Sequence, residues 1–309
     1  MKVSVAMTTY NGEKYILEQL ESMKNQDMQI DELFICDDGS SDNTVAIVSD
    51  YIQKNNLQST WHLIVNEKNL GYADNFNKGI NMCTGEYIFF ADQDDIWNKD
   101  KISSVVKVME NDKKIQVLCS DYEPYYCTDD APVIAKEVTD RMTGDDSIEQ
   151  IKLNNWSIYI RSEGCCMAMR KCFWDRVKSY WYSGWAHDEF IWEMAHCEES
   201  LYNYHHSTLK RRLHSNNVSK RKMHDLNTRI AFSKELAMHQ NKMLEYASVT
   251  GMNKTSIDLI CNTKRCLELR IEMMEKKKLL NIFPLVFRYQ KFYYSRKSVL
   301  VEMIMVLRG

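Results

Sequence analysis

Short hydrophobic runs alternate with amphipathic stretches through the first 120 residues of the chain. The hydrophobic runs have the length of single strands and lie at Val3–Tyr10, Glu32–Cys36, Trp61–Val65, Tyr87–Phe90 and Ile115–Cys119. Between them, apolar residues recur at helical spacing near residues 13–25, 45–52, 72–82 and 99–110. Strands that alternate with helices in this way predict an α/β fold, with a mostly parallel, mixed sheet flanked by helices.

Three of the expected strands end in polar loops. These loops are Thr8–Gly12, Asp37–Ser41 and Asp92–Asp95. In an open α/β sheet, ligands bind beyond the carboxyl ends of the strands. We therefore expect the three loops to meet at one edge of the sheet and to form a binding site there.

The third loop, DQDD at residues 92–95, is the most acidic. In an extended segment, side chains two residues apart point the same way, so Asp92 and Asp94 are expected to converge. A divalent cation such as Mg²⁺ would relieve their repulsion, because it binds one or two carboxylates and leaves its other positions to water and phosphates. The alternative is an exposed acidic turn that caps the next helix. The apolar strand before the loop and Trp97 after it favour the metal site.

A later motif supplies a candidate base. In SGWAHDEFIWEM, at residues 183–194, Asp188 stands between His187 and Glu189 at the expected start of a helix. An acid at this position is either a favourable first-turn charge or a general base that faces the sheet edge.

A second motif, KRRLHSNNVSK at residues 210–220, combines cationic side chains with a histidine. His214 is either a structural residue or a ligand that completes a metal shell begun by Asp94. Arg212 offers a positive charge to a phosphate group.

The sequence between the acidic loop and these motifs is less regular. The polar span 121–146 is expected to cross the surface, either as one wall of an acceptor site or as a plain solvated loop. Residues 156–169 are expected to form a strand that is interrupted at Gly164. Either another group approaches the backbone closely at this glycine, or the strand forms a bulge.

Charge and periodicity divide the chain near residue 220. Of 309 residues, 44% are hydrophobic and 27% charged, as is usual for a globular protein. The net charge of −3 conceals about −13 in residues 1–219 and +10 in residues 220–309, which also show long helical periodicities. We expect an α/β domain over 1–219 and a basic helical region over 220–309. That region is either a bundle with a solvated basic face or a surface for anionic membrane lipids.

No apolar run is long enough to span a membrane, and the chain begins directly with a strand pattern. This favours a cytoplasmic protein, and the membrane interpretation of the basic region would place it peripherally on the inner face of the cell membrane. The ten cysteines are scattered and form no CxxC pair, so we expect reduced thiols and no cysteine-based zinc site.

Several motifs, in the order in which they occur along the chain, resemble those of one known family. The segments VSVAMTTYNG, ICDDGSSDNT, NLGYADNFNKGI and GEYIFFADQDDIW are similar to those of family 2 glycosyltransferases, which have the half-Rossmann-like GT-A fold. The form ADQDDIW, with HDEF and RRLHSNNVS, further resembles bacterial rhamnosyltransferases of cell-wall and O-antigen polysaccharide synthesis. The resemblance covers residues 1–220 and is specific because the motifs occur together.

The resemblance implies an inverting transfer of rhamnose or another hexose to a hydroxyl of a growing polysaccharide. The acceptor would be a glycan or a lipid-linked glycan. The resemblance assigns the nucleotide and diphosphate to Thr8, Tyr10, Asp37, Asp38, Asp92 and Arg212. Asp38, alone or together with Asp37, would accept from the N3–H of the base, which favours a UDP- or dTDP-sugar donor. Asp94 and His214 would hold Mg²⁺ or Mn²⁺, and Asp188 would be the catalytic base. Arg211 and Glu189 are the alternatives for the clamp and the base.

Two other functions compete. A sugar-nucleotide nucleotidyltransferase shares this type of sheet, but such enzymes usually carry a Gly-rich loop with Arg and Lys after the first strand, and TTYNGEKY lacks it. A non-catalytic module could use the basic region on a membrane or on nucleic acid. The acidic first 219 residues would repel a nucleic acid, so we expect no nucleic-acid partner.

Overall fold

The structure is a computed structural model that describes residues 1–215, 225–293 and 297–308. The chain divides into two compact units. Unit 1 contains Met1–Ile151, Ser162–Trp192 and Ser200–Asn217, and unit 2 contains Lys152–Arg161, Glu193–Glu199 and Val218–Gly309. Two short segments from the first 219 residues thus belong to unit 2. The expected boundary at residue 219 lies outside the described residues.

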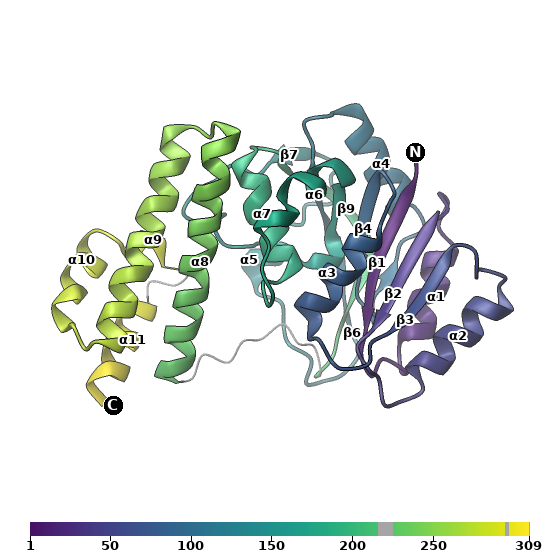
Figure 1. Cartoon of the computed structure of the whole chain (residues 1–309), viewed down its shortest axis with the longest axis horizontal. Helices are drawn as coiled ribbons and strands as arrows, with labels where there is room; N and C mark the ends of the chain where they lie inside the picture. The colour runs from purple at the N-terminus through teal and green to yellow at the C-terminus, as the bar shows by residue number, and fades with distance from the viewer. Residues whose placement is uncertain (216–224, 294–296, 309) are drawn as a thin grey trace. The chain divides into compact units, whose positions relative to one another are not determined.

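Within the described part of unit 1, nine strands form one mixed sheet (Figure 1). They are β1 (Val3–Thr9), β2 (Glu32–Asp37), β3 (Trp61–Val65), β4 (Tyr87–Ala91), β5 (Ile96–Trp97), β6 (Val117–Tyr126), β7 (Ile148–Gln150), β8 (Met167–Arg170) and β9 (Leu201–Leu213). Their order is β3-β2-β1-β4-β8-β6-β9-β5, and β7 pairs with β9. Strands β1 to β4 are parallel, whereas β8 is antiparallel to both its neighbours. The predicted mostly parallel, mixed sheet is confirmed.

Helices cover both faces of this sheet. Those that begin in unit 1 are α1 (Ile16–Lys24), α2 (Thr44–Lys54), α3 (Tyr72–Met82), α4 (Lys101–Asn111), α5 (Lys136–Thr139), α6 (Lys171–Val177) and α7 (His187–Cys197), with 3-10 turns η1 (Gly164–Cys166) and η2 (Lys178–Tyr180). Helices α1, α2 and α4 share one core with Val5 and Met7 of β1. Helix α3 lies on the opposite face, where Gly79 approaches Ala6 and Cys36. The parallel strands are therefore buried on both sides, which explains their continuous apolar runs.

Strand β6 is longer than the strand expected at 115–119. It pairs in parallel with β9 as far as Tyr126, which lies opposite Leu213, with irregular pairing around Asp121. The beginning of the polar span 121–146 is therefore part of the sheet and is not a surface loop.

The prediction of a strand at 156–169 is wrong over most of that range. Asn154 Oδ1 accepts hydrogen bonds from the backbone N–H groups of Trp156 at 2.8 Å and Ser157 at 3.0 Å, which creates a turn. The sheet is rejoined at Met167, where β8 begins. Ile158 is fully buried without belonging to a strand, so the apolar pattern there reflects burial and not sheet pairing.

Unit 2 is helical, as the periodicity predicted. Its helices are α8 (Leu226–Thr250), α9 (Lys254–Glu275), α10 (Ile282–Phe287) and α11 (Ser298–Arg308), with 3-10 turns η3 (Leu279–Asn281) and η4 (Gln290–Phe292). Gly251 ends α8 in the left-handed conformation at φ 70°, and the Asn253 side chain caps α9 by accepting from Ser256 N–H at 2.9 Å. Within the described ranges, no helix combines the length and the apolar character needed to cross a bilayer.

A buried ion pair anchors the last helix. Arg270 of α9 donates to fully buried Glu302 of α11, with 2.6 Å between Nη2 and Oε1. The Tyr293 hydroxyl donates to the same carboxylate at 3.2 Å. A buried charge costs little when it is paired and hydrogen-bonded, so α11 is held by polar contacts as well as by its apolar face.

Glu32 locks the amino-terminal edge of the parallel strands. Its carboxylate accepts from Gly85 N–H at 3.0 Å and Thr84 Oγ1 at 3.0 Å, and pairs with Lys2 at 2.7 Å. Ser4 Oγ is a further donor. Burial raises the pKa of Glu32, but these donors outweigh burial and lower the pKa from 4.5 to about 2. One carboxylate therefore joins the starts of β1, β2 and β4.

We expect Glu32→Gln to lower the free energy of unfolding at pH 7 by on the order of 2 kcal/mol, because hydrogen bonds to a charged group are lost. A lowered folded-state pKa stabilises the protein above the unfolded-state value, and this stabilisation disappears as the pH falls. The difference between the two proteins should thus shrink between pH 4.5 and about 2. Urea unfolding at several pH values measures it, with the exposed Glu137→Gln as control. A pH-independent difference would contradict the assignment.

Candidate active site

Asp37 shapes the loop after β2. Its Oδ1 accepts from the backbone N–H groups of Ser40 at 2.8 Å and Gly39 at 3.1 Å. Its Oδ2 accepts from Thr9 Oγ1 at 2.8 Å and Ser40 Oγ at 2.6 Å. Each carboxylate oxygen thus already has two donors, and the side chain is fully buried. In this arrangement Asp37 serves the loop and offers no unused acceptor position to a ligand.

Asp38 joins this loop to the one after β3. Its Oδ1 accepts from Asn66 Nδ2 at 2.8 Å and Leu70 N–H at 2.7 Å, and its Oδ2 accepts from Gly71 N–H at 2.9 Å. With a single donor on Oδ2, this oxygen retains an acceptor position. The contribution of Asn66 and Gly71 was missed from the sequence, although both lie in a polar loop at the end of an expected strand.

Gln93, the middle residue of the acidic loop, connects that loop to the end of β1. Its Oε1 accepts from Tyr10 N–H at 2.9 Å, and its Nε2 donates to the Tyr10 carbonyl at 3.1 Å. The Tyr10 ring remains half-exposed. Thr8 lies beside Cys36 in the register of β1 and β2. The three polar loops therefore do meet at one edge of the sheet.

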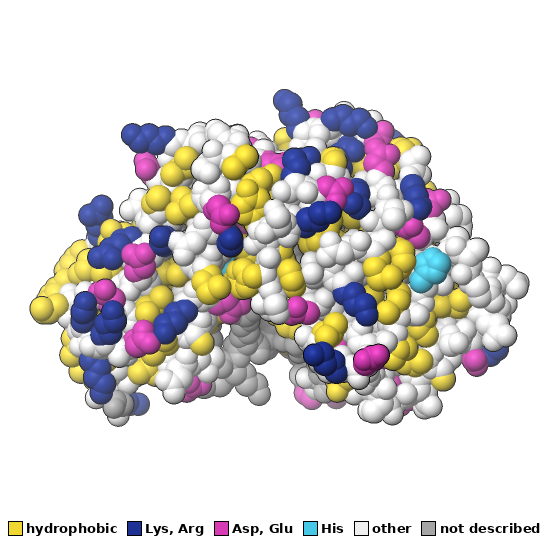
Figure 2. All heavy atoms as spheres, in the orientation of Figure 1, with side chains coloured by type: hydrophobic (Ala, Val, Ile, Leu, Met, Phe, Trp, Pro, Cys, Tyr) yellow, Lys and Arg dark blue, Asp and Glu magenta, His cyan; other side chains and the backbone are white. Residues whose placement is uncertain are grey.

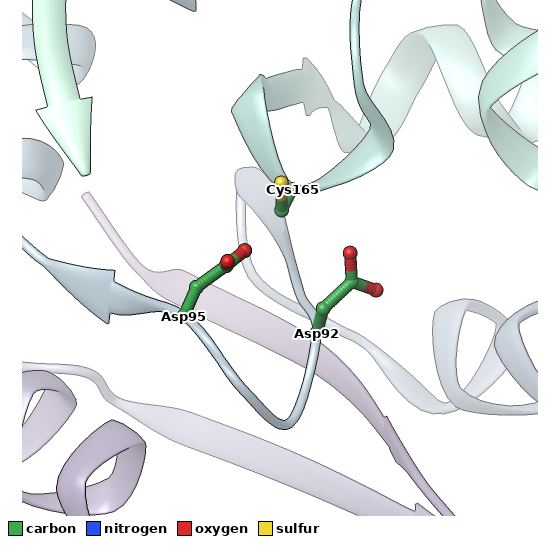
Figure 3. A group of neighbouring side chains, drawn as sticks. All are labelled: Asp92, Asp95 and Cys165. Carbon is green, nitrogen blue, oxygen red and sulfur yellow. The ribbon is translucent and has the colours of Figure 1, made fainter. Parts of the chain in front are cut away.

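The expectation that Asp92 and Asp94 converge is wrong. Residues 92–95 form a turn between β4 and β5 and not an extended segment. Asp94 bonds to His214, with 2.8 Å between Oδ2 and Nε2. Asp92 instead gathers with Asp95 and Cys165, whose possible ligand atoms all lie within 4.8 Å of one another. Figure 3 shows the two carboxylates reaching from either side of the turn toward the cysteine.

Burial governs the protonation of this second group. Burial and the charge of Asp94 raise the pKa of Asp95 to about 7. Burial and the charges of Asp95 and Asp94 raise the pKa of Asp92 well above its usual range. Asp95 Oδ1 accepts a hydrogen bond from the backbone N–H of Arg212 at 3.0 Å, so this acid also holds the end of β9 in place. The buried Lys101 ammonium, which donates to the Cys165 carbonyl at 2.9 Å, supplies a nearby positive charge.

Two groups at this turn are candidates for a Mg²⁺ or Mn²⁺ ion: the Asp94–His214 pair, and Asp92 with Asp95 and Cys165. In this structure Asp94 Oδ2 and His214 Nε2 lie 2.8 Å apart as a hydrogen bond, so an ion held by this pair would replace that bond, and its metal role stays a prediction. Hard cations prefer oxygen and accept imidazole nitrogen, whereas a thiol is a soft ligand. The hydrogen bond with Cys166, in which the Cys165 thiol is the donor, and burial also raise the pKa of Cys165, which disfavours the thiolate.

Arg212 secures the acidic turn from β9. Its Nε donates to the Asp94 carbonyl at 2.7 Å, and its guanidinium pairs with Glu18 of α1. It also stacks between the rings of Tyr15, at 4.4 Å, and Tyr125, at 5.1 Å. Glu18 and Tyr15 were not recognised from the sequence, because nothing distinguishes them from other residues of an amphipathic helix. The role of Arg212 toward a diphosphate stays a prediction.

Asp188 lies in the first turn of α7, where its Oδ1 accepts from Glu189 N–H at 2.9 Å. Its charge contributes to the raised pKa values of Asp92 and Glu163, after burial and other charges. Glu163 pairs with Arg211 at 2.9 Å. The structure therefore brings the candidate base to the same edge of the sheet as the acidic turn.

His187 fixes the start of α7. Its ring stacks on Phe76 of α3 at 3.8 Å and contacts Phe90 of β4 at 5.1 Å. Burial lowers the pKa of His187 to about 3, so the ring is neutral. A Cβ atom at Gly164 would lie 2.7 Å from His187 Nε2. The close approach predicted at Gly164 is confirmed, and the approaching group is this imidazole.

Comparison with known proteins agrees with this geometry. The model of the family "Glycosyl transferase family 2" matches residues 4–177. Among curated relatives, the dTDP-rhamnosyl transferase RfbG of Shigella flexneri is 40% identical over 109 residues, which cover 32% of this chain and 35% of RfbG. The chain spans about two fifths of the length of the curated relatives that it matches.

Solved structures extend the similarity to both units. S. aureus TarS 1–349 in complex with UDP-GlcNAc matches 100% of this chain and 90% of its own, with a TM-score of 0.64 at 16% identity. The mannosyltransferase PcManGT of Pyrobaculum calidifontis, in complex with GDP-Man and Mn²⁺, matches 98% of this chain and 86% of its own, with a TM-score of 0.53 at 14% identity. At these identities the likeness shows the fold, which is of the GT-A type.

The contact between Gly164 and His187 is testable. We expect Gly164→Ala to lower the free energy of unfolding by about 1–3 kcal/mol, because the new methyl group overlaps the imidazole. His187→Ala removes that overlap, so the double variant should lose much less than the sum of the two single variants. Urea unfolding of the four proteins measures this coupling. Additive losses would show that the two residues do not interact.

Proposed function

The chain belongs to glycosyl transferase family 2, and on that basis we propose that it moves a sugar from a nucleoside-diphosphate sugar to a hydroxyl group of a growing polysaccharide. The observation that carries the proposal is the meeting of Asp188, Asp92 and the Asp94–His214 pair at the carboxyl edge of the parallel strands. A displacement at a sugar carbon requires a base and a charge-stabilising group around one space, and Asp188 and the Asp94–His214 pair are our candidates for these roles.

The nucleotide would lie over the loops after β1 and β2. The half-exposed ring of Tyr10 offers an apolar face to the base, with Thr8 beside it. The remaining acceptor position of Asp38 suits the N3–H of uracil or thymine, while Asp37 keeps the loop in shape. Asp92 would bond to the ribose. These contacts favour a UDP- or dTDP-sugar.

Asp188 would take the proton of the acceptor hydroxyl while the oxygen attacks the anomeric carbon. The bond from that carbon to the diphosphate breaks on the opposite side, so the configuration inverts. Mg²⁺ or Mn²⁺, held by Asp94 and His214, would offset the charge that develops on the departing diphosphate. Arg212 adds positive charge beside it and keeps the turn in place through the Asp94 carbonyl.

The transferred sugar would be rhamnose or another hexose. A relative named as a dTDP-rhamnosyl transferase supports rhamnose, transferred from dTDP-rhamnose. Structural relatives in complex with UDP-GlcNAc or GDP-Man support a nucleotide-sugar donor in general. The acceptor would be a glycan, free or linked to a lipid.

Replacing Asp188 by Asn should reduce transfer by about 10²–10⁴-fold, the range for loss of a general base, and leave donor binding unchanged. Radiolabelled sugar transfer and calorimetric titration of the donor measure the two quantities. Glu189→Gln is the matched control, because it changes the neighbouring acid. Turnover retained in Asp188→Asn, or lost only in Glu189→Gln, would move the base to another residue.

Manganese and nucleotide should stabilise the protein together. A ligand at 100 times its dissociation constant adds ~2.7 kcal/mol to folding, so a thermal-shift screen of UDP-, dTDP- and GDP-sugars with Mn²⁺ should identify the donor. Asp94→Asn and His214→Ala should remove the Mn²⁺-dependent part of the shift. The exposed Asp129→Asn should not. An equal shift in all four proteins would place the ion elsewhere.

A further inference from the structure

Unit 2 exposes large apolar side chains around α10. Leu280 is 79% exposed, Phe283 58% and Phe287 83%. They are spaced three and four residues apart, so they share one side of the η3–α10 segment. We call these three residues the apolar ridge. Figure 2 shows hydrophobic side chains gathered over α10, at the left of the view, with Lys and Arg side chains beside them.

The core of unit 2 does not need the ridge. The opposite side of α10 already packs inward through fully buried Leu285, with Ile282 and Val286 partly buried against the same cluster. A surface helix usually turns polar residues outward. Apolar residues on the outer side of α10 therefore indicate a partner that is not part of this packing.

A second apolar stripe lies on the neighbouring helix. Leu300, Ile304 and Leu307 of α11 are exposed, at 56%, 44% and 62%, and are spaced by about one turn. Helix α11 contacts α10. Its inward side carries Val299, Val306 and the buried Glu302. Two adjacent helices thus both present apolar residues outward.

The surroundings of the ridge are strongly basic. Residues 276–308 contain eight Lys and Arg and one acid, Glu302. Glu302 is buried and forms an ion pair with Arg270, so it does not contribute negative charge to the surface. Lys276, Lys277 and Arg288 are exposed and form no ion pair within the described ranges. Glu272 of α9 pairs with Lys278 at 3.3 Å and interacts with the charge of Lys276. The outer surface near α10 nevertheless keeps an excess of positive charge next to aromatic and aliphatic side chains.

We propose that the apolar ridge and its basic flanks bind an anionic membrane surface. Phenylalanine and leucine enter the boundary between headgroups and acyl chains, while Lys and Arg attract anionic headgroups. A second copy of this chain fits the surface poorly, because pairing the patch with itself would bring like charges together. Nucleic acid would meet the positive charges but would leave the ridge in water. The proposal concerns attachment and does not depend on the transfer reaction.

Vesicle sedimentation tests this with the full chain. The protein should bind vesicles of phosphatidylcholine and phosphatidylglycerol, bind vesicles of phosphatidylcholine alone much more weakly, and lose affinity as salt rises. Phe283→Ser/Phe287→Ser should lower the partition coefficient about ten-fold or more, and Lys276→Glu/Lys277→Glu should do so by a similar factor. Both changes lie at exposed positions, so thermal unfolding should be little affected.

Matched controls are available on the same chain. Val249→Ser removes an apolar side chain that is 72% exposed on α8, and Lys107→Glu/Lys136→Glu reverses two exposed charges in unit 1. Neither should change vesicle binding. Absence of wild-type binding, or equal binding by all variants, would overturn the proposal. So would a wild-type dimer, seen by light scattering, that the ridge variant converts to a monomer without any change in vesicle binding.

Discussion

The crowding of carboxylates at the turn between β4 and β5 is the constraint on which the site depends. Three aspartates lie within four residues, and burial together with the charges of the neighbouring acids raises the pKa of Asp92 and of Asp95. The end of β9 brings two partners to this turn: Arg212 Nε donates to the Asp94 carbonyl, and His214 Nε2 lies 2.8 Å from Asp94 Oδ2. Sheet pairing with β6 and β5 brings that end to the turn. The pairing of β9 within the sheet therefore also determines which polar groups surround the acidic turn.

The alternation of strands and helices was predictable wherever burial leaves a simple pattern. Strands β1 to β4 are covered on both faces and read as apolar runs, and α3 begins and ends where its periodicity predicts. Strand β9 was missed because LYNYHHSTLKRRL mixes polar and apolar residues. Its polar groups are satisfied inside the fold, as by the 2.6 Å bond between Thr208 and Ser120 and the 2.9 Å bond between His206 and Asp100. Such partners are distant in sequence and leave no local signal.

The site was predicted to a similar extent. The motifs placed the acidic turn, the candidate base and the basic strand end at one edge, because each follows a recognisable element. The motifs predicted that His214 approaches Asp94, and the two side chains do meet. The grouping of Asp92 with Asp95 was not predicted, since residues 92–95 are not extended. Gln93 and Glu18 act through contacts with other loops and helices. Those contacts follow from the tertiary structure and not from spacing along the chain.

The buried pair of Arg270 and Glu302 limits how this protein can vary over evolution. A neutral residue at position 302 would leave the buried Arg270 without this partner, and one at position 270 would leave buried Glu302 paired with the more distant Arg229, at 3.7 Å. The two sites are therefore expected to change together. Loss of α11 would remove Glu302 and leave the Arg270 guanidinium without this partner in the interior of unit 2, so α9 depends on α11 for as long as position 270 keeps its charge.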